Sequence, residues 1–161
     1  MRNLPFPLFL TFLFLFSCLS LHAIDSKGAI IIASMEGQIT VTNNKSGKDL
    51  PSDQVKVGGL LFDGHTVKTG TGSKIVLLFS SGTITTLKEG SVLNIKKFAQ
   101  KSFDPKTAGK LSARKDEPSP SETVIDLSLG DMVVDVKKLK KESSFNIDSP
   151  VGTAGIRGTI P

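Results

Sequence analysis

Apolar and polar residues alternate over short distances along most of this chain. Residues 37–42 and 144–148 alternate with a period of two, and residues 74–79 form the longest apolar run after the N-terminal segment. A period of two places one face of a strand in a core and the other in water. Turn-forming residues recur about every eight to twelve positions, and no window keeps a helical apolar stripe. The pattern predicts an all-β fold: a single roll-like or sandwich-like domain of short, mostly antiparallel strands.

One stretch, at about residues 100–122, departs from this pattern. It is rich in Lys, Ser, Pro, Asp and Glu, with little apolar content beyond Phe103 and Leu111. Such a composition buries too little apolar surface to order itself, and long loops of this kind are typically surface insertions. We therefore expect a flexible polar insertion within a β domain that spans residues 28–161.

The first 23 residues have the pattern of a signal peptide. Arg2 supplies a positive charge, residues 8–19 are almost wholly apolar, and Ala23 is a small residue at a cleavage position. The alternative is an uncleaved anchor, but the apolar run is shorter than the roughly 20 residues that a membrane-spanning helix needs. We expect cleavage and export to the periplasm, the cell envelope or the extracellular space.

Cys18 is the only cysteine, and it lies in a Leu-Phe-Ser-Cys sequence that resembles a lipoprotein box. Lipidation of Cys18 would tether the protein to a membrane, whereas cleavage after Ala23 would remove Cys18 with the leader. The second interpretation is favoured, so membrane attachment is expected only if Cys18 is lipidated or the leader stays uncleaved. Either way, the folded part has no thiol for a disulfide or a thiolate metal site.

Length and charge limit the classes of partner. The 161 residues suffice for one domain, and loss of Arg2 with the leader leaves 19 of the 20 basic residues against 15 acidic ones, a net charge of +4. The basic cluster at residues 137–141 suits anionic lipid, polysaccharide or nucleic acid, but such lysines more often blunt a strand edge. The chain has no Trp or Tyr, and half of its ten Phe lie in the leader, so stacking platforms for bases are scarce. No nucleic-acid partner is expected.

Few groups are available for catalysis. His65 is the one histidine after the leader, and in its Asp-Gly-His context it is typical of a surface turn rather than of a base. No second histidine and no cysteine is present there as a metal ligand. Residues 70–73 are glycine-rich but precede a strand, whereas a phosphate cradle needs a helix N-terminus. The sequence predicts no catalytic, metal or cofactor-binding site, no cofactor, and a protein that is not an enzyme.

Three segments stand out from ordinary strand sequence: residues 35–41 (MEGQITV), the glycine-rich residues 57–83, and the residues 149–159 near the end of the chain. Taken together they resemble the FecR family of bacterial extracytoplasmic domains, in which the first is similar to the opening strand and the second to the central glycine-rich run. Residues 149–159 (SPVGTAGIRGT) are similar to its closing motif and are the most specific of the three. The matching signature residues are Gly58, Gly64, Thr69, Gly70, Gly82, Pro150, Gly155, Arg157, Gly158 and Thr159.

The resemblance implies an exported module of sensory or binding function, with another envelope protein as its partner. The best-known regulators of the family carry a cytoplasmic sigma-regulating segment before a membrane span. In this sequence only residues 1–3 precede the apolar part of the leader and could form such a cytoplasmic segment, so direct anti-sigma action is not expected. His65 stands where the family commonly has Asp, and the closing Phe of the motif is missing before the chain ends at Pro161, so a fragment of a longer protein is expected. The alternatives are a structural or scaffolding surface protein and an envelope carbohydrate-binding module.

Arg157 is the one charged residue of the closing motif. Its guanidinium offers a planar set of hydrogen-bond donors, suited either to a partner or to groups of its own domain. A single arginine in a strand is usually satisfied locally. A clamp onto carbonyls or an Asp of its own domain, such as Asp131 or Asp148, is therefore favoured over partner binding, and both roles stay open.

Overall fold

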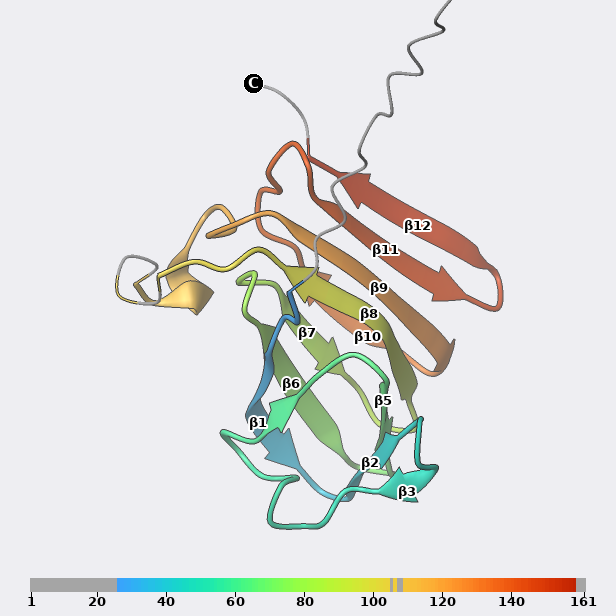
Figure 1. Ribbon diagram of the computed structural model, residues 1–161. Coiled ribbons are helices and arrows are strands. Elements are labelled where there is room, and N and C mark those ends of the chain that lie inside the picture. The colour runs from blue at the N-terminus through green and yellow to red at the C-terminus, as the bar shows by residue number, and fades with distance from the viewer. Residues whose placement is uncertain (1–25, 105, 107–108, 159–161) are drawn as a thin grey trace, which may run out of the picture.

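The computed structural model describes residues 26–104, 106 and 109–158 (Figure 1). The predicted signal peptide, Cys18 and Thr159 lie outside the described residues. The regular elements are β1 (Ile30–Glu36), β2 (Ile39–Asn43), β3 (Lys48–Asp49), β4 (Leu60–Leu61), β5 (His65–Thr69), β6 (Lys74–Phe79), β7 (Ile84–Leu87), β8 (Val92–Gln100), the 3-10 turn η1 (Leu111–Ala113), β9 (Ser121–Leu129), β10 (Met132–Asp135), β11 (Ser144–Ser149) and β12 (Gly152–Arg157).

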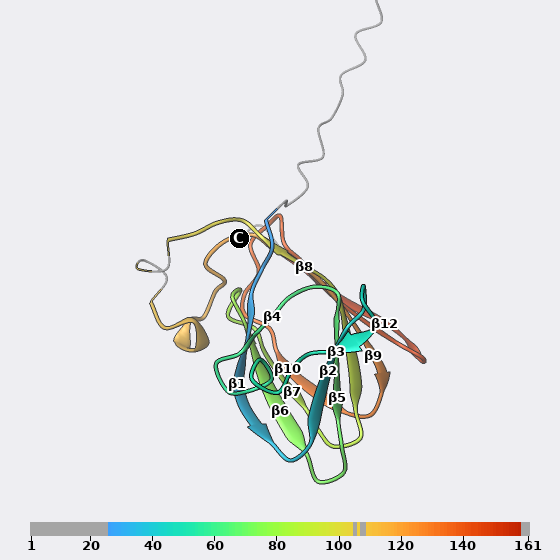
Figure 2. The same ribbon diagram turned by 60° about the horizontal axis from the view of Figure 1, so that its bottom comes forward.

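The strands form two sheets that face each other across a core (Figure 2). One sheet has five strands in the order β10-β7-β6-β1-β4, and the other has seven in the order β12-β11-β9-β8-β5-β2-β3. Among the described strands, β9 and β11 pair in parallel and the other pairs are antiparallel. The predicted all-β class with mostly antiparallel strands is confirmed.

The core between the sheets follows from the alternation in the sequence. In β6, Ile75, Leu77 and Phe79 are completely buried, while the residues between them face outwards. The ring of Phe79 packs edge-to-face on Phe98 of β8, with ring centroids 5.0 Å apart, and on Phe145 of β11 at 6.5 Å. Aromatic pairs prefer this geometry, so the three rings connect β6 with two strands of the opposite sheet.

The seven-stranded sheet continues past the five-stranded one on the β12 side. Phe145 on β11 still reaches the core, whereas every residue of β12 is exposed. Strand β11 is paired with β9 along Ser144–Asp148, and β12 forms the outer strand of the sheet in Figure 1. Strand β12 therefore has one neighbour, β11, and a second edge open to solvent.

The polar segment between β8 and β9 ends at a completely buried carboxylate, that of Glu117. Glu117 accepts hydrogen bonds from the hydroxyls of Ser121, at 2.6 Å, and Ser143. It also accepts one from the backbone N–H of Lys140 at 2.6 Å. The end of the segment is thus bonded to β9 and to the connection between β10 and β11, while flexibility of its earlier part stays a prediction.

Candidate partner-binding edge

The signature residues suggested by the sequence do not gather in one place. One group lies in turns within the body of the sandwich, and the other lies on the β11–β12 hairpin. Thr159 is outside the described residues. The body group is Gly58, Gly64, Thr69, Gly70 and Gly82, and the hairpin group is Pro150, Gly155, Arg157 and Gly158.

In the body, Thr69 and Gly70 join turns at one end of the sandwich. The Thr69 hydroxyl donates to the carbonyl of Lys88 at 2.6 Å and accepts from the N–H of Ser91 at 2.9 Å. The N–H of Gly70 donates to the carbonyl of Gln38 at 2.9 Å. Both residues satisfy backbone groups of neighbouring turns, as buried polar groups of a folded domain usually do.

The remaining body glycines are also held by the backbone. Gly58, Gly64 and Gly82 each donate their N–H to a carbonyl of a residue in β1, β8 and β6, respectively, at 2.7 to 2.8 Å. These bonds fix the turns that link the strands. The body part of the signature therefore lies in turns that are bonded to the strands of the sandwich.

The hairpin part of the signature lies on an exposed surface. Pro150 and Val151 form the turn between the strands, and the Ser149 hydroxyl donates to the carbonyl of Gly152 at 2.8 Å. Val151 is 98% exposed at the tip. The turn is thus closed by its own hydrogen bond and presents its apolar tip to solvent.

Gly155 and Gly158 are glycines because other atoms come close to them. A Cβ on residue 158 would overlap the carbonyl oxygen of Lys140, and the N–H of Gly158 donates to the carbonyl of Ser143 at 3.1 Å. A Cβ on residue 155 would lie 2.8 Å from Oδ1 of Asn146 across the hairpin. Position 158 should tolerate a side chain less well than position 155, because the backbone atoms near it cannot rotate away as the Asn146 side chain can.

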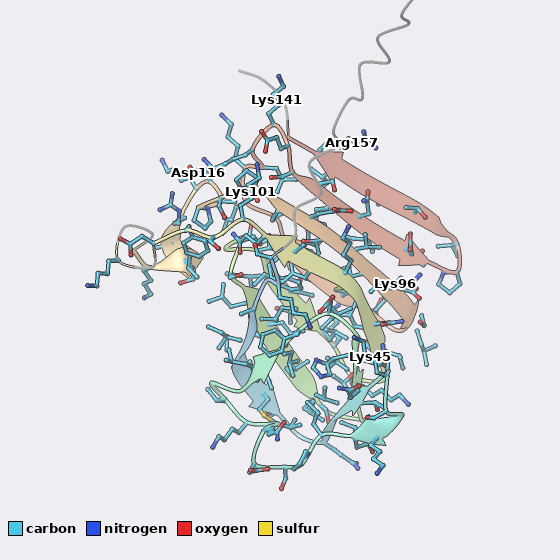
Figure 3. All side chains as sticks on the ribbon, in the orientation of Figure 1. Lys45, Lys96, Lys101, Asp116, Lys141 and Arg157 are labelled. Atoms are coloured by element: carbon cyan, nitrogen blue, oxygen red, sulfur yellow. The ribbon has the colours of Figure 1, made fainter. Side chains whose placement is uncertain are left out.

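Arg157 does not form the predicted clamp. It lies exposed at the end of β12 (Figure 3), and its guanidinium makes no hydrogen bond or ion pair with any residue described in the structure. Asp148 instead binds the Lys96 Nζ at 3.1 Å and accepts a hydrogen bond from the Thr153 hydroxyl at 3.0 Å. The bond from Lys96, and then that from Thr153, keep the pKa of Asp148 below its usual value, and Asp148 raises the pKa of Lys96.

The open edge of β12 presents backbone groups from alternate residues. Inter-strand bonds alternate along an antiparallel pair. Since Gly158 bonds to Ser143 at the end of a regular pairing, the even-numbered residues of β12 are those bonded to β11. The N–H and C=O groups of Thr153, Gly155 and Arg157 therefore point away from β11, toward solvent.

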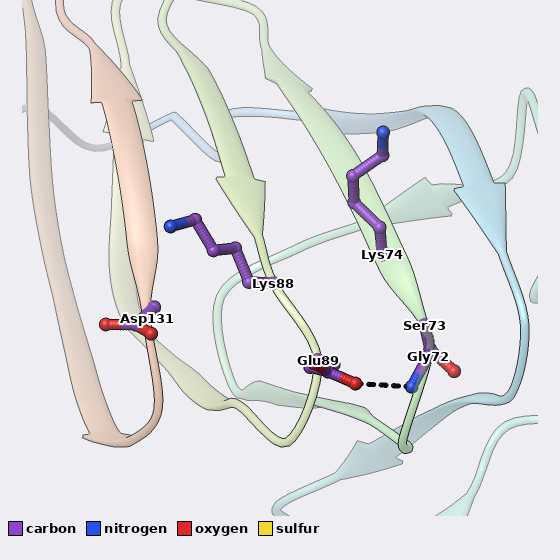
Figure 4. A pocket seen from close by; sticks show the side chains of 6 residues that line it. All are labelled: Gly72, Ser73, Lys74, Lys88, Glu89 and Asp131. Atoms are coloured by element: carbon purple, nitrogen blue, oxygen red, sulfur yellow. Dashed lines mark hydrogen bonds between the residues drawn. The ribbon is translucent and has the colours of Figure 1, made fainter.

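A second surface feature is a shallow hollow of about 330 Å³ at the turn end of β6, β7 and β10 (Figure 4). In it, the Glu89 carboxylate accepts a hydrogen bond from the N–H of Gly72 at 2.6 Å, and the Ser73 hydroxyl accepts one from the N–H of Gln38. The Ser73 hydroxyl itself donates to the carbonyl of Thr71 at 3.2 Å, so its proton is directed to the backbone. The hollow is lined by Gly72, Ser73, Lys74, Lys88, Glu89 and Asp131.

The prediction that His65 is a surface turn residue is wrong. His65 begins β5, is buried, and shares its inward face with Val67 and Thr69. Its Nδ1 lies 3.1 Å from both the N and the O of Phe62. The alternation within β5 thus turns the ring inwards. Within the described part of the chain, no three His, Cys, Asp or Glu side chains are grouped as metal ligands.

The fold and the hairpin define a β-sandwich whose exposed feature is an open strand edge. Residues 65–160 match the model of the FecR family, described as FecR protein, and the match covers more than half of the chain. The chain belongs to the FecR family. This family is one of signalling and regulatory proteins that are typically associated with the cell envelope.

The other comparisons add no relative. Neither the curated proteins nor the solved structures include a significant match to this chain. In the described residues, the helical structure is too short to cross a membrane.

Proposed function

We propose that this protein is an exported, non-enzymatic sensory or binding module of FecR type. It works in the periplasm or cell envelope through contacts with another envelope protein. The contact surface is the β11–β12 hairpin. Family membership supports the regulatory class, and the shape of the hairpin supports the choice of surface.

The observation that carries this proposal is the position of Arg157. The glycines and Thr69 of the signature meet groups of their own domain, whereas Arg157 is exposed and forms no ion pair with a described residue. Conserving a fold does not require a guanidinium at such a position. Exposed arginines on a rigid element are common anchors of protein interfaces.

A crosslinking experiment tests the choice of surface. A photoreactive residue is placed at Thr153, on β12, or at Val57, an exposed control position in the connection before β4. In cells that express the chain with its leader, we expect a discrete protein adduct from position 153, at least about fivefold stronger than from position 57, since an interface core excludes competing solvent.

Two results would contradict the proposal. Equal adducts from both positions would show that the hairpin is not the contact surface. An adduct from position 153 whose added mass is removed by glycosidase would favour the carbohydrate-binding alternative.

A further inference from the structure

We propose that the open edge of β12 takes up an extended strand of a different protein. That strand continues the seven-stranded sheet and places a carboxylate beside Arg157. The inference rests on the proposed function and names the class of partner that the hairpin fits.

The backbone of β12 has hydrogen-bonding groups that are not paired with β11. Thr153, Gly155 and Arg157 direct an N–H and a C=O each to the open side of β12, as the pairing with β11 requires. An extended chain is the structure that matches such a row of alternating donors and acceptors, and added strands bind in this way. Main-chain hydrogen bonds would therefore provide the contact.

The other three edge strands, β3, β4 and β10, are shorter than β12. Strands β3 and β4 have two residues each, too short to template a partner. Strand β10 has four and ends at Asp135, whose carboxylate pairs with Lys137 at 2.6 Å. Strand β12 has six residues, GTAGIR, with no proline and no charge before its last position. Of the four edge strands in the described part of the chain, β12 offers an incoming strand the longest run of residues.

The two faces of β12 set the pattern of the incoming strand. Ala154 and Ile156 share a face with Ile147, which packs against the core, and Ile156 remains 45% exposed. Thr153 and Arg157 share the opposite, polar face. Because side chains alternate along a strand, the partner segment should alternate apolar and polar residues.

Arg157 argues for a carboxylate in that segment and against a second copy of this chain. A guanidinium binds a carboxylate through two parallel hydrogen bonds. Strand β12 itself has no acidic residue, so pairing two copies edge to edge would bring no carboxylate to Arg157 from the paired strands. Asp148, which lies opposite Thr153 at the other end of the hairpin, is already bonded to Lys96 and Thr153. A strand from another protein can supply the carboxylate that would pair with Arg157.

The test uses the full chain and a defined probe. The probe is a labelled nine-residue peptide, acetyl-Thr-Val-Thr-Val-Glu-Val-Thr-Val-Thr-amide, with a second peptide in which Gln replaces Glu. Thr153→Pro removes an outward N–H, and Thr153→Val is its matched control, because both lose the hydroxyl bond to Asp148. Proline is tolerated where the N–H of an edge strand faces solvent, so the variant should fold.

We expect Thr153→Pro to weaken binding of the Glu peptide at least about tenfold, because the peptide carbonyl that would accept the outward N–H is buried without a donor. Thr153→Val keeps that N–H, so it should weaken binding less than about twofold. Arg157→Gln should weaken the Glu peptide about tenfold and leave the Gln peptide within about twofold.

Several outcomes would overturn the inference. The first is equal affinity of the two Thr153 variants for the Glu peptide, and the second is an equal loss of affinity for both peptides in Arg157→Gln. The others are no binding of either peptide to the wild type, and dimerisation of the chain through β12. If any of these accompanied a protein adduct at position 153, strand addition would be wrong while the proposed function stood.

Discussion

Replacing Glu117 by alanine should lower the free energy of unfolding by about 3 kcal/mol and Tm by roughly 10 °C. The completely buried carboxylate accepts hydrogen bonds from Ser121, Ser143 and the N–H of Lys140. Alanine would leave these donors without an acceptor, and each unpaired buried group costs about 1 to 3 kcal/mol. Urea unfolding of the full chain, followed by circular dichroism, measures the loss.

Glu117→Gln is the matched control. One amide oxygen can keep the bonds from Lys140 and Ser143, and the amide nitrogen can donate to the Ser121 hydroxyl. The expected loss is about 1 kcal/mol. An alanine variant within about 0.5 kcal/mol of the wild type would mean that the end of the polar segment is not bonded to the sandwich in solution.

Replacing Gly158 by alanine should detach the end of β12 from β11. The added Cβ would overlap the backbone carbonyl of Lys140, and that carbonyl cannot rotate away. We expect the amide of Ile156, which is bonded to β11, to exchange its hydrogen at least about tenfold faster, because the pairing opens locally. Hydrogen exchange followed by NMR resolves this single amide.

Gly155→Ala is the control for this variant. Its Cβ would meet only Oδ1 of Asn146, at 2.8 Å, and that side chain can turn away. The exchange rate of Ile156 should then stay within about threefold of the wild type. Equal rates in both alanine variants would show that the approach to Lys140 does not hold the strand.

The sequence predicted the fold class because alternation in strands such as β6 directly reflects burial. The parallel pairing of β9 with β11 could not be predicted, because no local sequence pattern indicates which distant strands become neighbours. Glu117 was missed for a related reason. A glutamate in a polar stretch is expected to be exposed to solvent. The hydroxyl partners of Glu117 include Ser143, 26 residues away in the sequence.

The candidate site was found by the motif, but its chemistry depended on contacts that the sequence does not show. Asp148 was expected to hold Arg157, yet the register of β8, β9 and β11 brings Lys96 to Asp148 instead. The orientation of the Arg157 backbone also required the pairing of β12 with β11. His65 was misread because the two-residue period of β5 outweighs the turn signal before it.

Amide exchange of β12 in the full chain, with and without the Glu peptide, tests the binding edge most directly. Binding at this edge predicts that the amides of Thr153, Gly155 and Arg157 exchange at least about tenfold more slowly with the peptide bound, because their N–H groups then bond to the added strand. Unchanged exchange at these three amides, with peptide-induced slowing elsewhere on the sandwich, would contradict it.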